Sequence, residues 1–330
     1  MRLARKGGRW MGLAVLAAVF LAAPHFLQPY WRGILTEVLM WGLFALGFDI
    51  IFGKTGLLNF GMSAFIGMGS YGYALAVQHL GVGMWSGLLA ALLVSLVFSY
   101  LVGLLVTRFG SHYFVVFTII ISMILFFLAM NLRGLTGGDM GIILRLREFQ
   151  LGPWSFSLRN AVAKYYLVLG VVAAAFYLVL RFFDSPLGRA IVAVKENELR
   201  TEVIGYDTKQ LKLISFTLSG VVAGLAGGLY PVINNSTNAE LFFWFFSGKA
   251  VLWTVVGGAG TLWGPFLGAG IMVYLEDVLS SWLVDYYPIM VGVLLIVIIL
   301  LAPKGILGSL QQWLRHQAGK KQKGDRGAAA

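Results

Sequence analysis

The residue types that perform covalent or metal chemistry are few in this sequence. It contains no cysteine, which excludes thiol nucleophiles, disulfides and cysteine-bound metals. Its histidines are scattered and have none of the spacings typical of a metal site: His25, His79, His112 and His316. No GxSxG motif and no set of metal ligands falls within an apolar segment. We therefore expect no catalytic residue, no metal site and no cofactor bound to this chain, and the sequence disfavours an enzyme.

The tripeptide Gly53-Lys54-Thr55 has the form of the end of a phosphate-binding P-loop. That motif needs another glycine five residues before Gly53, and the residue there is Phe48. The tripeptide also follows a long apolar segment, whereas a P-loop follows a β-strand. The sequence thus predicts no nucleotide-binding loop, and any ATP that drives this protein must be hydrolysed by another chain.

Two glycine-interrupted apolar stretches, one in each half of the chain, are the candidates for a solute pathway. They cover 53–71 and 247–270. In transporters, such interruptions mark discontinuous helices whose freed backbone groups face a substrate. The alternative is that these glycines only let helices approach closely. The candidate pathway residues are Asn59, Phe60, Gly61, Met62, Ser63 and Phe65 in the first stretch, and Ser247, Gly248, Lys249, Gly257 and Gly258 in the second.

Lys249 lies within or at the edge of an apolar run, where a charge is costly unless it faces a cavity or a partner. The sequence leaves three interpretations open. Lys249 could pair with Glu276 or Asp277 in the next apolar segment, or it could attract an anionic group of a solute. It could also sit at the membrane interface, with the spanning segment starting at Ala250.

The segment 185–205 has a different character, because charged and apolar residues are interspersed in it. Pro186 and Gly205 are typical start and stop signals of a helix. Helical spacing relates Leu187, Ala190, Ile191, Val194, Glu198 and Glu202. We predict one short amphipathic helix on the cytoplasmic face, either solvated or docked on another protein.

The elements that must position these residues are transmembrane helices. Of the 330 residues, 59% are hydrophobic and only 12% are charged, whereas soluble domains carry about 25% charged residues. The 42 glycines suit close helix packing in lipid. The apolar runs are continuous, which favours helices over the alternating strands of a membrane β-barrel.

We predict an all-α integral membrane protein with about ten spans of roughly 20 apolar residues, and the glycine interruptions allow about eight to eleven. The predicted spans are 11–29, 33–52, 61–80, 84–107, 111–131, 163–182, 211–231, 241–260, 264–284 and 287–303. They belong to one transmembrane domain, 1–310, with an outer loop at 132–162 and a cytoplasmic loop at 183–210. Residues 311–330 form a basic tail that we expect to be disordered.

Basic residues orient the chain in the membrane. They precede the first predicted span, occupy the loop 183–210 and follow the last span, so the positive-inside rule places all three regions in the cytoplasm. Both termini are therefore predicted to be cytoplasmic. This topology accounts for the net charge of +11, and nucleic acid is not an expected partner. An alternative for residues 1–23 is a cleaved signal peptide.

At the cytoplasmic loop the sequence resembles the M-type permeases of the branched-chain amino acid ABC importers. The similar segments are 185–205, 212–230, the glycine-rich stretch 56–71, Thr136-Gly137-Gly138, 257–265 and 302–305, within about 35–310. The resemblance implies that the loop 183–210 couples the chain to ATPase subunits. The candidate coupling residues are Arg189, Val194, Glu196, Asn197, Glu198, Glu202 and Gly205.

The resemblance also implies a complex in the lipid of the bacterial cytoplasmic (inner) membrane. Its other members would be a second, H-type permease, two ABC ATPase subunits that bind ATP and magnesium, and a periplasmic solute-binding protein. ATP binding would close the ATPases, and the cytoplasmic loop would pass that motion to the spans, which alternate their access to the two sides.

The sequence departs from the family pattern at several positions. Met62 stands where many relatives have Gln or His, and Lys249 where an acidic residue is frequent. Arg200 and Thr201 replace alanines of the coupling loop. Relatives also import urea, short amides and aromatic acids, and a cationic Lys249 on the pathway would favour a solute with a carboxylate.

An ion-driven secondary transporter is the alternative of a different class. Such proteins bind the coupling ion with carboxylates or with unwound backbone carbonyls. Asp49 and Glu37 are the plausible carboxylates in a predicted span before Glu276. This is a thin set, so the sequence favours the ATP-driven importer.

Overall fold

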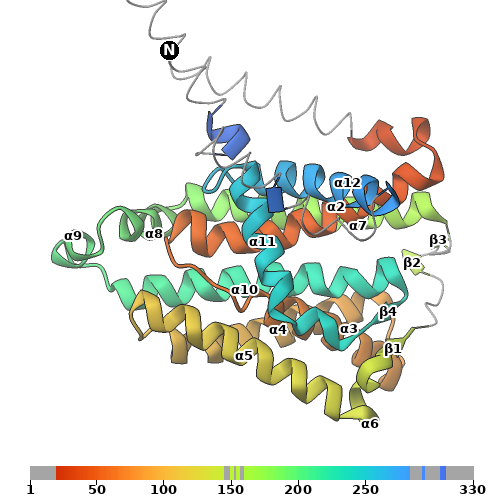
Figure 1. Ribbon diagram of the computed structural model, residues 1–330, viewed down its shortest axis with the longest axis horizontal. Helices are drawn as coiled ribbons and strands as arrows, with labels where there is room; N and C mark the ends of the chain where they lie inside the picture. The colour runs from red at the N-terminus through yellow and green to blue at the C-terminus, as the bar shows by residue number, and fades with distance from the viewer. Residues whose placement is uncertain are drawn as a thin grey trace, which may run out of the picture.

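The computed structural model describes residues 20–144, 149–151, 154–156, 160–282, 292–293 and 305–309. In these residues the chain forms a bundle of helices with short β-ladders at one end (Figure 1). The long helices are α2 (Pro29–Asp49), α3 (Met62–His79), α4 (Met84–Val106), α5 (Ser111–Asn131), α7 (Ala161–Asp184), α10 (Thr208–Asn234) and α12 (Gly264–Trp282). The shorter ones are α6 (Arg133–Thr136), α8 (Pro186–Glu196), α9 (Glu198–Val203), α11 (Trp244–Gly257), the π-helix η1 (Ile50–Lys54) and the 3-10 helices η2 (Gly138–Met140) and η3 (Ala239–Phe242).

The predicted spans between 33 and 284 all coincide with helices, so the prediction of a helical membrane protein is confirmed. Five of these helices are long and apolar enough to cross a membrane: Pro29–Lys54 (α2 with η1), Met84–Val106, His112–Asn131, Ala161–Asp184 and Thr208–Asn234. About half of the predicted span 11–29, nearly all of 287–303 and the whole basic tail lie outside the described residues. The total number of spans and the side of each terminus stay predictions.

Side-chain caps fix where several helices begin. The side chain of Asn160 accepts a hydrogen bond from the Val162 amide at the start of α7. Ser185 caps α8, whose first residue is Pro186, and Asp207 caps α10. Such caps satisfy amide groups that have no partner inside the helix. They separate α7, the cytoplasmic loop and α10 at defined residues.

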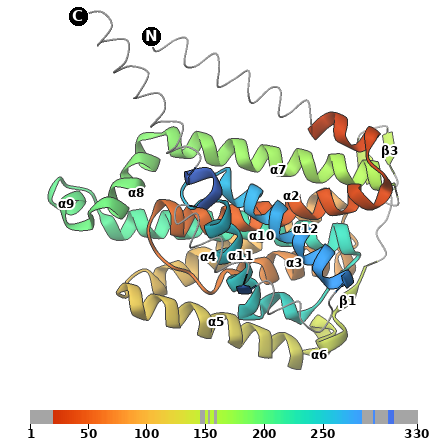
Figure 2. The ribbon, with the colours of Figure 1, turned by 45° about the horizontal axis from the view of Figure 1, so that its top comes forward.

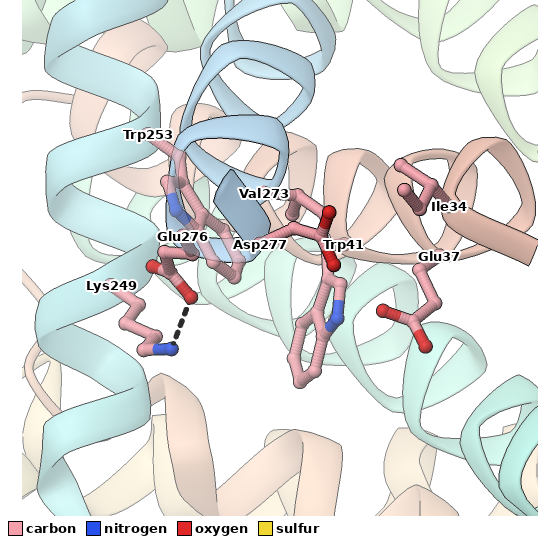
Figure 3. Close-up of a pocket in the computed structure, with 8 residues that line it drawn as sticks. All are labelled: Ile34, Glu37, Trp41, Lys249, Trp253, Val273, Glu276 and Asp277. Carbon is pink, nitrogen blue, oxygen red and sulfur yellow. Dashed lines mark hydrogen bonds and ion pairs between the residues drawn. The ribbon is translucent and has the colours of Figure 1, made fainter. Parts of the chain in front are cut away.

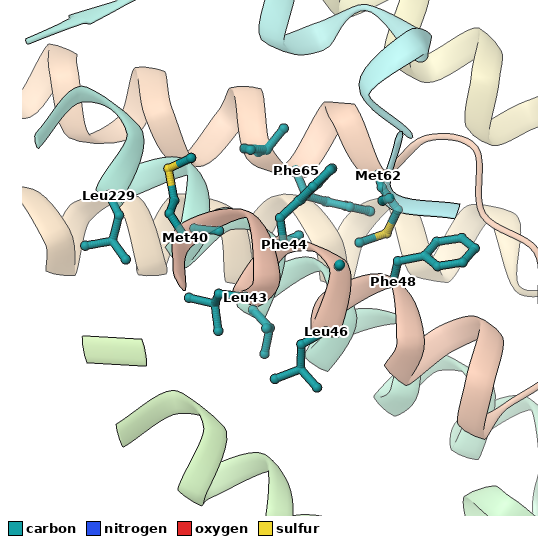
Figure 4. Close-up of a cluster of buried hydrophobic side chains, with 14 of the residues drawn as sticks. Met40, Leu43, Phe44, Leu46, Phe48, Met62, Phe65 and Leu229 are labelled. Atoms are coloured by element: carbon teal, nitrogen blue, oxygen red, sulfur yellow. The ribbon is translucent and has the colours of Figure 1, made fainter. Parts of the chain in front are cut away.

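Helices α2 and α10 form the interior of the bundle. Helix α10 packs against α2, α3 and α4, while α2 also packs against α7 and α12. Between α3 and α10, a side chain at Gly69 or Gly227 would collide with the backbone of the other helix. Close helix approach is thus one use of the glycines. Large side chains of α2, among them Phe44, form a buried apolar cluster with Phe65 of α3 and Leu229 of α10 (Figure 4).

Helices α4 and α5 lie at the periphery and expose large apolar side chains, among them Leu93, Leu101 and Ile124. Exposed apolar residues of this size on a peripheral helix suit contact with lipid. The interior helices α2 and α10 and the peripheral helices α4 and α5 therefore differ as expected for a protein that is surrounded by a membrane.

The segment 241–260 was predicted as one span, and the structure divides it. The 3-10 helix η3 ends at Phe242, and α11 begins only at Trp244. With 14 residues, α11 is about 21 Å long, shorter than the ~30 Å apolar core of a bilayer. Phe242 packs against Gly67 and Tyr71, midway along α3. Helix α11 therefore starts within the bundle, as predicted for a discontinuous helix.

The predicted outer loop contains short strands, so the protein is not helical throughout. Strand β1 (Ile142–Ile143) pairs antiparallel with β4 (Ser236–Thr237), and β2 (Phe149–Leu151) pairs with β3 (Trp154–Phe156). The β1–β4 ladder ties this loop to the segment that leads into α11. At the start of the loop, Gly137 and Gly138 have φ of 76° and 62°, which glycine adopts readily.

Candidate functional site

A cluster of serines joins the two glycine-rich stretches. The Ser63 amide donates to Ser247 Oγ over 2.8 Å, and the hydroxyls of Ser63 and Ser122 lie 2.6 Å apart. Ser122 Oγ also donates to the carbonyl of Phe242 over 2.5 Å. All three serines are fully buried. The structure thus brings Ser63 and Ser247 together, as a pathway shared by both stretches requires. Ser122 belongs to α5, whose apolar sequence gave no sign of it.

The residues around Ser63 have separate surroundings. The Gly61 amide donates to Asn59 Oδ1 over 2.8 Å, and Asn59 Nδ2 lies 3.4 Å from Met62 Sδ. Asn59 and Met62 are fully buried. Phe65, also predicted to line the pathway, instead packs its ring against Phe216 of α10 with centroids 5.4 Å apart. It therefore belongs to the core of the bundle.

The remaining predicted pathway residues serve different purposes. Phe60 and Gly248 are half-buried, and a side chain at Gly248 would meet no atom within 4 Å. Gly257 lies against the backbone of Gly264 on α12, where any side chain would collide. Gly258 ends α11 with a φ of 116°. Gly257 and Gly258 therefore shape the α11–α12 hairpin, which is the alternative that the sequence left open.

Lys249 lies within α11 and forms an ion pair with Glu276 of α12. The Lys249 Nζ atom is 2.7 Å from Glu276 Oε2. It also lies 5.8 Å from the centre of the Phe245 ring, within the range of a cation–π interaction. Pairing with Glu276, the first of the three interpretations, is confirmed. The helix begins at Trp244 and not at Ala250, which argues against the interface interpretation.

This ion pair borders a cavity of about 330 Å³ between α2, α11 and α12, which we call the charged cavity (Figure 3). Its lining residues are Ile34, Glu37, Trp41, Lys249, Trp253, Val273, Glu276 and Asp277. Asp277 accepts a hydrogen bond from the Tyr30 hydroxyl. Glu37 makes no hydrogen bond or ion pair with any residue that the structure describes. Lys249 and Glu276 neutralise each other, and Glu37 adds a further carboxylate to the lining.

Asp49, at the end of α2, is fully buried and bound by backbone groups. Its Oδ1 accepts a hydrogen bond from the Gly260 amide over 2.5 Å, and its Oδ2 accepts one from the Leu262 amide over 3.3 Å. Lys54 Nζ donates to the Gly260 carbonyl over 2.6 Å. We call Asp49, Lys54 and Gly260 the inner clamp. Backbone donors occupy both oxygens of Asp49, which makes this residue a poor ligand for a coupling ion.

The cytoplasmic loop contains two helices instead of the single one predicted. Helix α8 ends at Glu196, and α9 starts at Glu198. Asn197 between them has an extended backbone, with φ of −163°, and its side chain caps α9 by accepting a hydrogen bond from the Arg200 amide. The interruption was missed because helical spacing continues across it; Asn197 itself, a favoured capping residue, was the available signal. Gly205, predicted as a stop signal, follows α9 with a φ of 96°.

The apolar residues of the two helices face different surroundings. Ala190, Ile191 and Val194 of α8 are buried against the bundle, where they contact Phe182, Phe183, Leu211 and Ile214. Val194 was predicted to contact a partner, yet its position shows that it holds α8 to the bundle. On and after α9, by contrast, Leu199, Val203 and Ile204 are 75%, 86% and 67% exposed. Sequence reasoning missed these three residues, because it assigned one apolar face to the whole loop.

The polar residues predicted on the loop lie at its surface. Arg189, Glu196, Asn197, Glu198 and Glu202 are all exposed. Glu198 forms an ion pair with Lys212 of α10 at 2.5 Å. Helices α8 and α9 extend beyond the ends of α7 and α10 (Figures 1 and 2).

The sequence was compared with known proteins. Residues 31–299 match the family described as the permease component of branched-chain amino acid transport systems, and this match covers most of the chain. The chain belongs to this permease family. The permease is 26% identical to the LivM proteins of Salmonella typhimurium and Escherichia coli, over 93% of its own length and 77% of theirs.

LivH of Escherichia coli is also 26% identical, over 86% of the permease and 96% of LivH. These relatives are named as permease proteins of high-affinity branched-chain amino acid transport systems. No solved structure matches the permease. The resemblance found from the sequence is thus confirmed at the level of the family, and the chain is a multi-pass membrane permease.

Proposed function

We propose that this permease is one of two permease subunits of an ATP-driven importer in the bacterial inner membrane, and that its solute is a branched-chain or similar amino acid. Similarity to both LivM and LivH supports a pair of related permeases. The other members are two ABC ATPase subunits, which bind ATP and magnesium, and a periplasmic solute-binding protein. The chain itself hydrolyses no ATP.

The observation that carries this proposal is the exposed apolar surface of α9. Leu199, Val203 and Ile204 are exposed on the loop whose Lys195 contacts Gly53, beside the inner clamp. Exposed apolar patches at a polar surface mark sites of protein–protein contact. In the proposed importer this surface docks on an ATPase subunit, while the buried residues of α8 transmit the movement of α9 to the spans.

The charged cavity supports an amino acid over the other solutes of the family. An α-ammonium group suits a space that is lined by Trp41, an aromatic ring of the type that binds cations well, and by the Glu37 carboxylate, which has no hydrogen-bond or ion-pair partner among the described residues. Lys249 is already paired with Glu276, which weakens the expectation that it attracts a carboxylate. Urea and short amides carry no positive charge for the Glu37 carboxylate to attract. Aromatic carboxylates carry a negative charge, which this carboxylate would repel. These solutes remain the alternatives within the family.

An ion-driven transporter is the alternative of another class. The hydrogen bonds from backbone amides to Asp49 argue against an ion-driven transporter. Among the described residues of α2, they leave Glu37 as the carboxylate without a hydrogen-bond partner. The two classes differ in the source of energy. Uptake that stops when ATP is depleted, with the proton gradient maintained, supports the ABC importer, and continued uptake contradicts it.

The partner chains can be tested by purification of the tagged permease from native membranes in mild detergent, followed by mass spectrometry. We expect two ATPase chains and a second permease, and a homodimer without any nucleotide-binding chain would contradict the proposal. Direct binding of amino acids, urea and aromatic acids to the periplasmic protein of the same operon or complex then identifies the solute. A preference for urea or an aromatic acid would contradict the amino acid assignment.

A further inference from the structure

The end of α2 is an unusual element, because it changes from an α-helix to a π-helix before it stops. The π-helix η1 covers Ile50–Lys54 and follows directly on Asp49. π-helical turns are rare, and they occur frequently at functional sites. This turn lies where α2 meets the cytoplasmic loop and the α11–α12 hairpin. It therefore connects elements that are far apart in the sequence.

On one side, η1 and the residue before it hold the loop between α11 and α12. Asp49 accepts from the Gly260 amide, and Lys54 donates to the Gly260 carbonyl, so both backbone groups of Gly260 are held. Gly260 and Leu262 have φ of 80° and 62°. A positive φ is unfavourable for leucine, and such a conformation persists when its surroundings enforce it. The Asp49–Leu262 hydrogen bond is one of those restraints.

On the other side, η1 is bound by the cytoplasmic loop. Lys195 Nζ of α8 donates to the Gly53 carbonyl over 2.7 Å. A side chain at Gly53 would collide with Asp49 Oδ1 and with the Gly260 amide. Gly53 therefore lies between Lys195 and the inner clamp and is in close contact with both. The links run from α8 through Gly53 and η1 to Gly260.

We propose that Lys195 and the inner clamp form the route by which a movement of the cytoplasmic loop reaches the α11–α12 hairpin. Lys195 and Asp49 are positioning residues in this route, which rests on the proposed ATP-driven function. Hydrogen bonds suit the task because they are directional, and a shift of α8 changes the position of the Gly53 carbonyl directly. The buried residues Ile191 and Val194 attach α8 to the adjoining ends of α7 and α10. The hairpin carries Ser247 and Lys249, so the route ends at the candidate pathway.

The absence of cysteine allows a direct test in the complete complex, reconstituted in liposomes. A single cysteine replaces the half-buried Ala259, next to Gly260 in the hairpin loop. The rate at which a maleimide labels this cysteine is measured with and without ATP. We expect ATP to change the rate roughly fivefold, in the range of ordinary allosteric coupling. Lys195→Met should reduce the change to less than about twofold and lower the solute moved per ATP.

Two further variants separate this role from a general effect of charge. Lys195→Arg retains a donor for the Gly53 carbonyl and should restore most of the ATP-dependent change. Lys209→Met removes a lysine from the same loop whose side chain has no hydrogen-bond partner among the described residues, and it should leave the change intact. Equal labelling responses in Lys195→Met and Lys209→Met would overturn the proposal.

The experiment also distinguishes the two proposals from each other. A complex that lacks ATPase chains, or that transports without ATP, contradicts the proposed function itself. ATP-driven transport with no ATP-dependent labelling change at position 259 overturns the route alone. A labelling change that depends on Lys195 supports the route, whichever solute is carried.

Discussion

The inner clamp and the charged cavity both place carboxylates and a lysine beside α2, but they differ in how those charges are satisfied. In the clamp, Asp49 and Lys54 are bound to backbone groups of the hairpin loop. In the cavity, Lys249 pairs with Glu276, while Glu37 has no partner among the described residues. Charges within a membrane span are costly unless they are satisfied or face a polar space. In the clamp, the charged side chains therefore hold the hairpin loop in place. In the cavity, the carboxylate of Glu37 is left to interact with a solute.

The largest effect is expected from Asp49→Asn, which tests the clamp. The amide cannot accept both backbone hydrogen bonds and turns a donor toward an amide. We expect a loss of about 2–3 kcal/mol in the free energy of unfolding, typical of a buried polar group left unsatisfied, together with loss of uptake. Thermal unfolding in detergent measures the first. Asp184→Asn, at the exposed end of α7, is the control. Equal stability of the two variants would contradict a structural role for Asp49.

Leu199→Glu and Val203→Glu test the proposed contact of α9 with an ATPase subunit. Both side chains are exposed, so the fold should be retained, whereas association with the ATPases should weaken at least roughly tenfold if these residues anchor the contact. Co-purification of ATPase chains from membranes measures this association. Glu202→Gln, on the same helix, should have little effect. Full retention of the ATPases in both glutamate variants would refute the docking assignment.

Glu37→Gln tests the cavity and should leave the fold intact. Since Glu37 has no partner among the described residues, the free energy of unfolding should change by less than about 0.5 kcal/mol. The solute concentration for half-maximal uptake should rise roughly tenfold, if an ammonium group loses a charge-assisted contact. Glu240→Gln, outside the cavity lining, is the control. If Glu37→Gln lost as much stability as Asp49→Asn, the carboxylates of the cavity and of the clamp would both be structural, which would contradict the comparison.

The smallest effect is expected for the Lys249–Glu276 pair. Each side chain is about one-fifth exposed, so we expect a coupling of about 1–2 kcal/mol in a double-mutant cycle. Lys249→Met alone should be worse than Lys249→Met with Glu276→Gln, because the single change leaves a carboxylate unpaired. Uptake and unfolding of the four proteins measure this. Additive effects would show that the two residues act independently.

The sequence was sufficient for the features that depend on local composition. The apolar run 61–80 predicted α3 at Met62–His79, while Pro186 marked the start of α8 and Gly205 the turn that follows α9. The pairing of Lys249 with Glu276 was one of three stated possibilities. It could be foreseen because both residues lie in consecutive apolar segments, where a lone charge is costly.

The features that depend on contacts between distant segments could not be predicted. The inner clamp joins Asp49 to Gly260, 211 positions later in the chain, and nothing in either local sequence specifies the other. Likewise, the spacing in 185–205 could not separate the apolar residues that cover the bundle from those of α9 that remain exposed. That distinction depends on where α7 and α10 end.

The interrupted entry into α11 has a consequence for a copy of the chain that lacks its partner subunits. The segment before α11, which includes the short 3-10 helix η3, reaches the middle of α3 and carries the exposed Glu240. Such backbone is tolerated within a bilayer where protein or a water-filled space surrounds it. The chain itself buries Ala239, Leu241 and Phe242, so a copy without partner subunits would present chiefly Glu240 of η3 to its surroundings. A carboxylate within the bilayer is costly unless it faces protein or water, so we expect a copy without its partners to be less stable in the membrane than one in the complex.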